Sequence, residues 1–169
     1  LPAARGGAAS VLAIDSSAPA LDTALANAAL NGVADRFDVR RGKVEAELKR
    51  CAEAGERFDL VSLDPPKLAA SRRDAEAALR KYEALCIDGL RVLDADGLLM
   101  VASCSHAIGA DDLKQVLASA GGRSQRRLDV VATLEQPADH PYPAAMREGR
   151  YLSAVVVRAG GTPTRPTES

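Results

Sequence analysis

The chain has few aromatic residues and no long apolar run. It holds three Tyr, two Phe and no Trp among 169 residues, which leaves little material for the stacking platforms that bind single-stranded nucleic acid. No run approaches the roughly 18 to 20 apolar residues that cross a bilayer, and no signal-peptide pattern opens the sequence. These absences argue against a stacking-type nucleic-acid module and against a membrane protein.

Cysteine is also scarce. Cys51, Cys86 and Cys104 are odd in number, and their spacings suit neither a zinc site nor a disulfide framework. We therefore expect no metal site and a reducing, cytoplasmic environment.

The net charge of -1 gives no global sign of nucleic-acid binding. Basic side chains do form local clusters, and such clusters are usually solvated surface, with phosphate contact as the alternative. The clusters are Arg40, Arg41 and Lys43; Arg72 and Arg73; and Arg123, Arg126 and Arg127.

The length and the composition predict one domain over residues 1–159, with 47% apolar residues. Residues 160–169 are rich in Gly, Thr and Pro and predict a disordered tail. Because no initiator Met precedes Leu1, we expect the chain to be a piece of a longer protein.

Hydrophobic periodicity predicts alternating strands and helices. The predicted strands cover 10–14, 37–40, 58–63, 98–102, 128–134 and 151–157, and the predicted helices cover 18–30, 44–54, 74–93 and 111–120. Ser16 or Ser17 would cap the first helix, and Gly121-Gly122 would close the last. This order predicts an α/β fold: a mainly parallel sheet with helices on both faces and an antiparallel C-terminal edge strand.

Two short motifs follow predicted strands. Asp64-Pro65-Pro66-Lys67 closes the apolar run 59–63, and Ser103-Cys104-Ser105 closes the run 97–102. In a parallel α/β sheet, ligands bind outside the carboxyl ends of the strands, so a carboxylate, an ammonium and a thiol would share one crevice. The alternative for the first motif is a plain turn, because two prolines cannot continue a central strand.

The three thiols differ in their predicted surroundings. Cys51 and Cys86 fall within helical segments and are interpreted as inert buried side chains. Cys104, just past a strand end, is expected to be partly exposed, where hydroxyls and main-chain donors could stabilise a thiolate. His106 is expected on a loop surface. His140 is expected to be structural or to contact a residue of the site without contacting the substrate itself.

Asp15 ends the first predicted strand. It could cap the helix that follows, or it could hold ribose hydroxyls, as an acid at a strand end does in dinucleotide-binding folds. The residues leave both possibilities open. No glycine-rich phosphate loop precedes Asp15 as part of a strand–loop–helix unit.

In this order, these residues resemble the class I methyltransferases that use S-adenosylmethionine, a Rossmann-like fold. The nearest resemblance is to the bacterial 23S ribosomal RNA 5-methylcytidine methyltransferases of the large-subunit methyltransferase I type. The matching segments are 11–17, 20–27, 30–32, Phe58-Asp59, 64–67, 103–105, 138–141, Glu148-Gly149 and Tyr151-Leu152.

The resemblance implies methylation of cytosine C5 in ribosomal RNA. It implies that Cys104 is the nucleophile and that Asp64 contacts or helps to activate the base. The remaining implied assignments are Asp15, Ser16, Asp64 and Pro65 in the S-adenosylmethionine site, and Pro66, Lys67, Ser103 and Ser105 in the substrate site.

The sequence also departs from the family. The resemblance leads us to expect the family's first strand, its glycine-rich loop and its N-terminal RNA-binding module before Leu1. The family's acid after the third strand is replaced around Arg41-Gly42. One rival interpretation is a methyltransferase of the same fold that acts on another base or on a small molecule. Another is a non-catalytic domain that folds by self-association, as a homodimer, because a missing central strand would leave two strand edges open.

Overall fold

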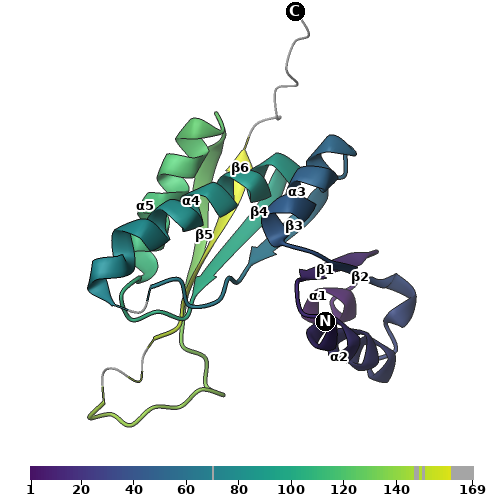
Figure 1. Cartoon of the computed structure of the whole chain (residues 1–169), viewed down its shortest axis with the longest axis horizontal. Coiled ribbons are helices and arrows are strands. Elements are labelled where there is room, and N and C mark those ends of the chain that lie inside the picture. The colour runs from purple at the N-terminus through teal and green to yellow at the C-terminus, as the bar shows by residue number, and fades with distance from the viewer. Residues whose placement is uncertain (70, 147–148, 150, 161–169) are drawn as a thin grey trace, which may run out of the picture. The chain divides into compact units, whose positions relative to one another are not determined.

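A computed structural model describes residues 1–69, 71–146, 149 and 151–160 (Figure 1). Its contacts divide the chain into two compact units, residues 1–54 and residue 55 onward. The single domain over residues 1–159 stays a prediction. Of the predicted tail, Gly160 is instead the last residue of a strand, and residues 161–169 lie outside the described residues.

The first unit holds a two-stranded parallel sheet. Val11 pairs with Phe37 at one end of the sheet, and Asp15 pairs with Arg41 at the other. Its elements are α1 (Pro2–Arg5), β1 (Val11–Asp15), α2 (Ala18–Leu30), the 3-10 helix η1 (Ala34–Arg36), β2 (Phe37–Arg41) and α3 (Val44–Glu53).

Local signals in the sequence explain the bounds of α2. Ser17 is its N-cap and accepts a hydrogen bond from Ala20 N at 3.3 Å, which confirms one of the two predicted caps. After the last turn, Gly32 takes a φ of 66°, a left-handed conformation that glycine adopts without strain. The helix then buries Ala28 against Val33 and Phe37, and these side chains form the small core of the unit.

The second unit holds a four-stranded sheet in the order β3-β4-β6-β5. Its elements are β3 (Phe58–Leu63), the 3-10 helix η2 (Arg72–Asp74), α4 (Ala75–Val92), β4 (Leu93–Ser103), α5 (Ala110–Arg123), β5 (Arg127–Glu135) and β6 (Ser153–Gly160). β3 and β4 are parallel, and β6 is antiparallel to β4 and to β5. The predicted antiparallel pair is confirmed. The predicted edge position of the C-terminal strand is wrong, because β6 lies between β4 and β5.

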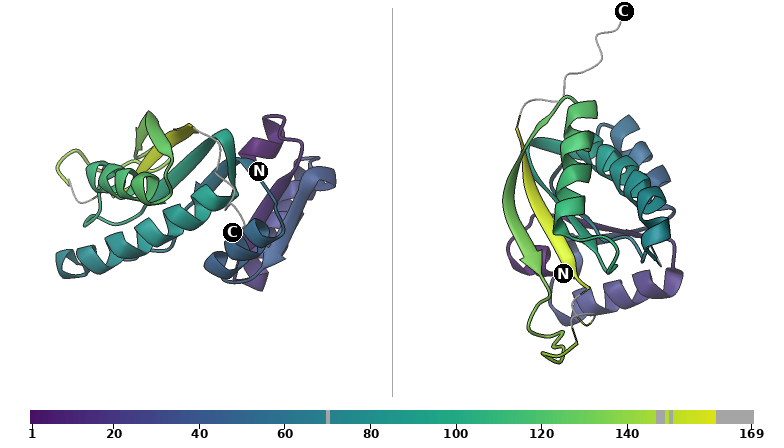
Figure 2. Two further views of the ribbon diagram at one scale, coloured as in Figure 1. Left: turned by 90° about the horizontal axis from the view of Figure 1, so that it is seen from above. Right: turned by 90° about the vertical axis from the view of Figure 1, so that its left-hand side faces the viewer.

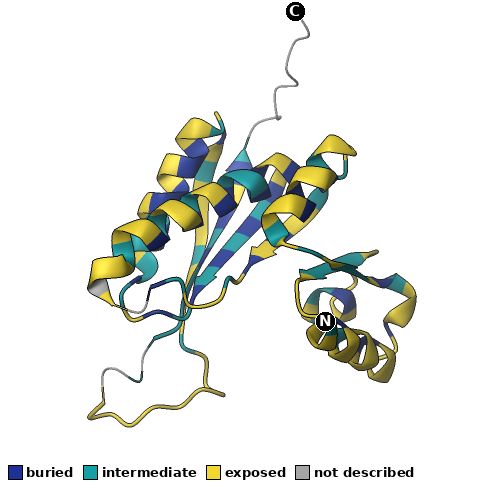
Figure 3. Ribbon diagram, in the orientation of Figure 1, coloured by how far each residue is buried: buried dark blue, intermediate teal, exposed yellow. Residues whose placement is uncertain are grey.

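Helices α4 and α5 lie side by side against one face of this sheet (Figure 2). Gly89 lets α4 approach closely, because a Cβ there would lie 3.2 Å from Leu63 Cδ1 and 3.3 Å from Leu99 Cδ1. The helices turn exposed residues outward and bury their other side on the strands (Figure 3). The alternating burial of β4 places Leu99 and Val101 in this core.

Two predicted boundaries are wrong for tertiary reasons. Residues 94–97, which the prediction leaves between the helix 74–93 and the strand 98–102, lie inside β4 as an irregularity of the ladder, with Asp96 at a φ of 59°. The last helix continues through Gly121-Gly122 to Arg123. A Cβ at Gly121 would lie 2.9 Å from Arg126 O. This glycine therefore does not end the helix; it lets the chain just before β5 approach the helix closely.

The basic cluster 123–127 is not a free cationic surface. Arg126 is buried, and its guanidinium donates to four main-chain carbonyls: Leu90 O at 3.0 Å, Leu93 O at 2.8 Å, Asp94 O at 2.7 Å and Ala159 O at 3.3 Å. Burial lowers the pKa of Arg126, with nearby Asp94 and Asp96 acting against it. The surface expectation is therefore wrong for Arg126, which joins α4, β4 and β6.

Candidate functional site

The two motifs of the sequence leave the second unit's sheet at one edge. β3 and β4 are parallel neighbours, with Leu63 paired to Val101. Asp64 follows the last residue of β3, and Cys104 follows the last residue of β4. The carboxyl ends of adjacent parallel strands thus place the carboxylate segment and the thiol segment side by side, as the sequence predicted.

The segment after β3 presents polar groups to solvent. Asp64, Pro66 and Lys67 are exposed, and Pro65 is half-buried. Proline has no N–H to donate, so the ladder with β4 cannot continue past Leu63. The segment is therefore a rigid corner whose charged side chains are accessible.

Ser105 fixes the segment after β4 against the segment after β3. Its hydroxyl donates to Ala69 O at 2.8 Å and accepts from Ala107 N at 3.3 Å. Its main-chain N–H donates to Ser103 Oγ at 3.2 Å. Ser103 and Ser105 are only 1% and 2% exposed, so both hydroxyls lie beneath the surface, and the substrate role of these serines stays a prediction.

Cys104 differs from the other two thiols in its surroundings. It is half-buried, whereas Cys51 and Cys86 are fully buried. Burial raises the pKa of Cys86 to about 12, with a smaller contribution from Glu83, so this thiol stays protonated and unreactive at physiological pH. The interpretation of Cys51 and Cys86 as buried side chains is confirmed.

Tyr82 of α4 is a neighbour of this site that sequence reasoning missed. The residue has no exposed surface, and its hydroxyl has no hydrogen-bond partner within the described residues. Burial raises the pKa of Tyr82, the Ser103 side chain opposes this shift, and Cys104 and Asp64 add to it. We interpret the Ser103 contact as a near approach without hydrogen-bond geometry. The helical period predicted only that Tyr82 lies on the apolar face of its helix. The one feature of the sequence that could have indicated a role is its hydroxyl group, because Phe would pack equally well at that position.

In the first unit, Asp15 and Ser16 lie at the carboxyl end of β1, and both are exposed. Asp15 Oδ1 accepts a hydrogen bond from Ser17 N at 2.7 Å, and Ser16 O accepts from Arg41 Nε at 3.4 Å. The cap of α2 is Ser17, so Asp15 is not the helix cap. Within the part of the chain that the structure describes, Asp15 Oδ2 accepts no hydrogen bond, and it can face a ligand.

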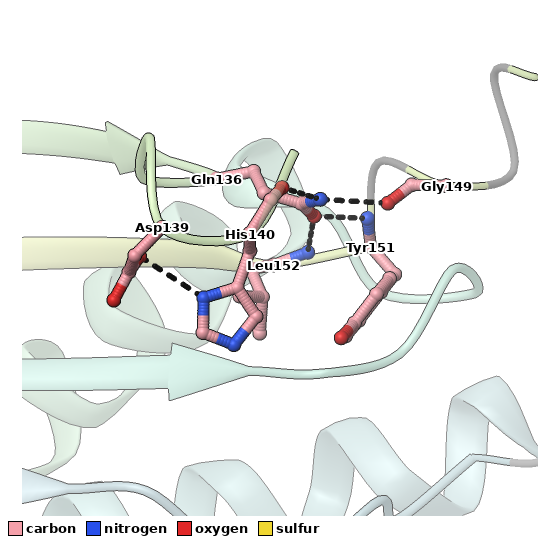
Figure 4. A network of polar contacts seen from close by, with 6 residues as sticks. All are labelled: Gln136, Asp139, His140, Gly149, Tyr151 and Leu152. Atoms are coloured by element: carbon pink, nitrogen blue, oxygen red, sulfur yellow. Dashed lines mark hydrogen bonds and ion pairs between the residues drawn. The ribbon is translucent and has the colours of Figure 1, made fainter. Parts of the chain in front are cut away.

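Gln136 closes the loop that joins β5 to β6 (Figure 4). Its amide nitrogen donates to His140 O at 2.7 Å and to Gly149 O at 2.8 Å, and its oxygen accepts from Tyr151 N at 3.1 Å and from Leu152 N at 3.4 Å. The side-chain amide thus uses both donors and accepts two hydrogen bonds. No sequence motif indicated this role.

The two histidines lie in loops. His140 is exposed, and its Nδ1 lies 3.0 Å from Asp139 Oδ1. This contact lowers the pKa of Asp139. His106 is exposed, as predicted, and its ring centroid lies 5.7 Å from that of Tyr151.

Among the described residues, no three His, Cys, Asp or Glu side chains gather as a metal site would require. In the same part of the chain, no helix is both long and apolar enough to cross a membrane. Two surface hollows, one lined by Arg80, Glu83 and Arg123 among others and one by Leu1, Arg5 and Asn31 among others, include neither Asp64 nor Cys104.

Mixed sheets with packed helices define an α/β Rossmann-like fold, and solved structures share it. A candidate methyltransferase in complex with SAH superposes with a TM-score of 0.78 at 18% identity, over 92% of this chain and 40% of that one. A candidate SAM-dependent methyltransferase from Streptococcus mutans gives 0.77 at 18% identity, with the same coverage. These likenesses confirm the predicted fold class.

The family model described as "Conserved hypothetical protein 95" matches residues 2–108, and the chain belongs to this family. Curated relatives support the same kinship. The chain is 35% identical over 159 residues to the ribosomal RNA large subunit methyltransferase I of Shewanella denitrificans, and 33% identical over 157 residues to that of Erwinia tasmaniensis. It spans 40% of the length of each relative, and 94% and 92% of its own length is aligned. The resemblance seen in the motifs is thus confirmed.

Proposed function

We propose that the chain is the catalytic part of an S-adenosylmethionine-dependent methyltransferase that modifies cytosine C5 in ribosomal RNA. One observation carries the chemistry. Cys104 is a half-buried thiol beside the exposed Asp64 segment, while the other two thiols are fully buried. The names of the curated relatives support the methyl transfer and the RNA substrate. A cytoplasmic location, a homodimer and the absence of a membrane partner remain predictions.

The residues at the end of β1 fit the sugar of the cofactor. The carboxylate of Asp15 is exposed and uses only Oδ1 for its hydrogen bond to Ser17 N, so Oδ2 can accept from a ribose hydroxyl. Ser16 lies beside it, and the assignment of Asp64 and Pro65 to the cofactor stays a prediction. S-adenosylmethionine, when bound, supplies an electrophilic methyl group.

Cytosine C5 is a weak nucleophile, so the reaction needs covalent activation. The thiolate of Cys104 adds to C6, a C–S bond forms, and the π electrons of C5=C6 become available at C5. C5, made nucleophilic in this way, would accept the methyl group that S-adenosylmethionine supplies when bound. Loss of the C5 proton to a base returns two electrons to C5=C6, and the C6–S bond breaks to release Cys104.

The exposed corner after β3 would hold the base. Asp64 is an acceptor that can take a hydrogen bond from the exocyclic amino group of cytosine. Pro65 and Pro66 keep this carboxylate on a fixed main chain, and Lys67 can contact an RNA phosphate. Ser103 and Ser105, predicted as substrate residues, would act from beneath the surface.

The test uses RNA in which cytidine is replaced by 5-fluorocytidine. Fluorine at C5 cannot leave as a proton does, so the adduct between Cys104 and C6 would persist and would be seen as a protein–RNA band under denaturing conditions. The assay is run separately with this chain and with a longer natural polypeptide that contains it. Cys104→Ala should abolish both the adduct and methyl transfer, and Cys51→Ala is the matched control. Methyl transfer by Cys104→Ala would contradict the thiol route.

A measurement of the affinity for S-adenosylmethionine tests the cofactor site independently of methyl transfer. Calorimetric titration with S-adenosylmethionine should show binding that Asp15→Asn weakens, because an amide loses an acceptor oxygen for the ribose. Asp22→Asn on the exposed face of α2 is the matched control. Equal affinity of the Asp15 and Asp22 variants would refute the ribose role of Asp15.

A further inference from the structure

The hydroxyl of Tyr82 is a buried donor that the fold leaves unpaired. Tyr82 is fully buried, and its oxygen has no hydrogen-bond partner within the described ranges of the chain. Burial of such a group without a partner is unfavourable, because the hydrogen bonds to water are lost and not replaced. Phenylalanine would fill the same space without this penalty, so packing alone does not account for the hydroxyl.

The groups around this hydroxyl belong to the candidate site. Because α4 connects the parallel strands β3 and β4, it runs antiparallel to them, and Tyr82 in its first half lies toward their carboxyl ends. Ser103, Cys104 and Asp64 each influence the pKa of Tyr82. Gly89 lies two helical turns further along the same face of α4, where it permits the close contact with Leu63 of β3 and Leu99 of β4. The helix therefore holds Tyr82 firmly under the ends of both strands.

Ser103 connects this hydroxyl to the thiol. Its Oγ already accepts from Ser105 N at 3.2 Å, and it lies directly before Cys104 in the chain. Ser105 in turn bonds to Ala69 O. A hydrogen bond from Tyr82 to Ser103 Oγ would complete a connected set of groups beneath Cys104.

We propose that Tyr82 is a positioning residue for Cys104: the hydroxyl without a partner in the described residues donates to Ser103 Oγ in solution, and this bond fixes the main chain that presents the thiol to the Asp64 segment. This inference rests on the proposed function only in naming Cys104 as the reactive thiol. Tyr82 itself does not touch the base or the cofactor.

The variant Tyr82→Phe tests this role because it removes one oxygen atom and keeps the packing. The rate of alkylation of Cys104 by iodoacetamide is measured in the folded protein, with mass spectrometry to locate the label. Cys51 and Cys86 are buried and should stay unlabelled. We expect labelling to slow by about threefold or more, the effect of losing the proposed hydrogen bond to Ser103.

Two further variants exclude a merely structural effect. Tyr142→Phe removes the hydroxyl of an exposed tyrosine and should label as the wild type does. Ser103→Ala should slow labelling, and adding it to Tyr82→Phe should cause no further slowing, because both act through one contact. If Tyr82→Phe labels as fast as the wild type or faster, or if the two effects on the rate add, the inference is overturned.

The labelling needs neither S-adenosylmethionine nor RNA, so the positioning role of Tyr82 and the proposed function can be refuted independently. If Cys104→Ala still transfers methyl groups, the thiol chemistry is wrong but the positioning of Cys104 by Tyr82 can stand. If Tyr82→Phe labels normally while Cys104→Ala is inactive, the thiol chemistry stands and the positioning role falls.

Discussion

The hydroxyl of Ser105 donates a hydrogen bond to the main-chain carbonyl of Ala69 at 2.8 Å, across 36 positions of the sequence. One residue belongs to the segment after β4, which carries Cys104, and the other to the segment after β3, which carries Asp64. Because both are buried, water does not compete for the bond. This contact joins the two functional segments beyond the ends of their strands.

Ser105→Ala should therefore lower the free energy of unfolding by about 1 kcal/mol, since a buried hydrogen bond is lost and Ala69 O is left without its partner. Urea unfolding followed by circular dichroism measures the change. Ser62→Ala on β3 is the control, because Ser62 is exposed, and it should have almost no effect. Equal stabilities of the two variants would show that the bond contributes nothing.

Arg126→Met should destabilise the second unit strongly. The variant keeps much of the side-chain volume but leaves the carbonyls of Leu90, Leu93, Asp94 and Ala159 without their donor. We expect a loss of about 3 kcal/mol or more, because each unsatisfied buried group adds to the cost.

Arg127→Met provides the comparison for Arg126, again by urea unfolding. Arg127 is exposed and pairs only with Asp129 at the surface, so its loss should change stability by about 0.5 kcal/mol or less. Similar losses for the two variants would contradict the structural role assigned to Arg126.

Gln136→Leu should open the base of the loop between β5 and β6. The amide protons of Tyr151 and Leu152 donate to Gln136 Oε1, so their hydrogen exchange should accelerate by about tenfold in the variant. Nuclear magnetic resonance resolves the two amides individually. Gln115→Leu changes an exposed glutamine of α5 and should leave both rates as they are; unchanged rates in Gln136→Leu would mean that other contacts hold the loop.

The buried thiol of Cys86 predicts a pH dependence of stability. Burial raises its pKa from 9.0 to about 12, so the folded state keeps the proton that the unfolded chain releases above pH 9. The contribution is fully present below pH 9 and is lost as the pH rises toward about 12.

Urea unfolding across this alkaline range should show a steeper loss of stability for the wild type than for Cys86→Ala. Cys104→Ala is the matched control, because Cys104 is half-buried, and its slope should follow that of the wild type. The slopes are compared because Cys86→Ala also leaves a small cavity, which lowers stability at every pH. Parallel curves for Cys86→Ala and the wild type would contradict this prediction.

Much of the fold was predictable because its signals are local. The helical period located α4, the capping Ser17 and the left-handed Gly32 located the ends of α2, and the Pro65-Pro66 pair located the end of β3. Each signal depends on a few neighbouring residues, so it is present in the sequence whatever the rest of the chain does. The adjacency of the Asp64 and Cys104 segments followed from one further rule, the common edge of parallel strands.

Only the tertiary structure decided the partners of polar atoms and the order of the strands. The placement of β6 between β4 and β5, the burial of Arg126 among carbonyls and the bond from Ser105 to Ala69 each join residues far apart in the sequence. The continuation of α5 through Gly121 has the same origin, because glycine is needed there for the close approach of Arg126 O and not for the end of the helix. Sequence alone determined which segments are helices, strands and corners, since those depend on local periodicity. Packing decided that the hydroxyl of Tyr82 is buried without a hydrogen-bond partner among the described residues, since burial is a property of the assembled chain.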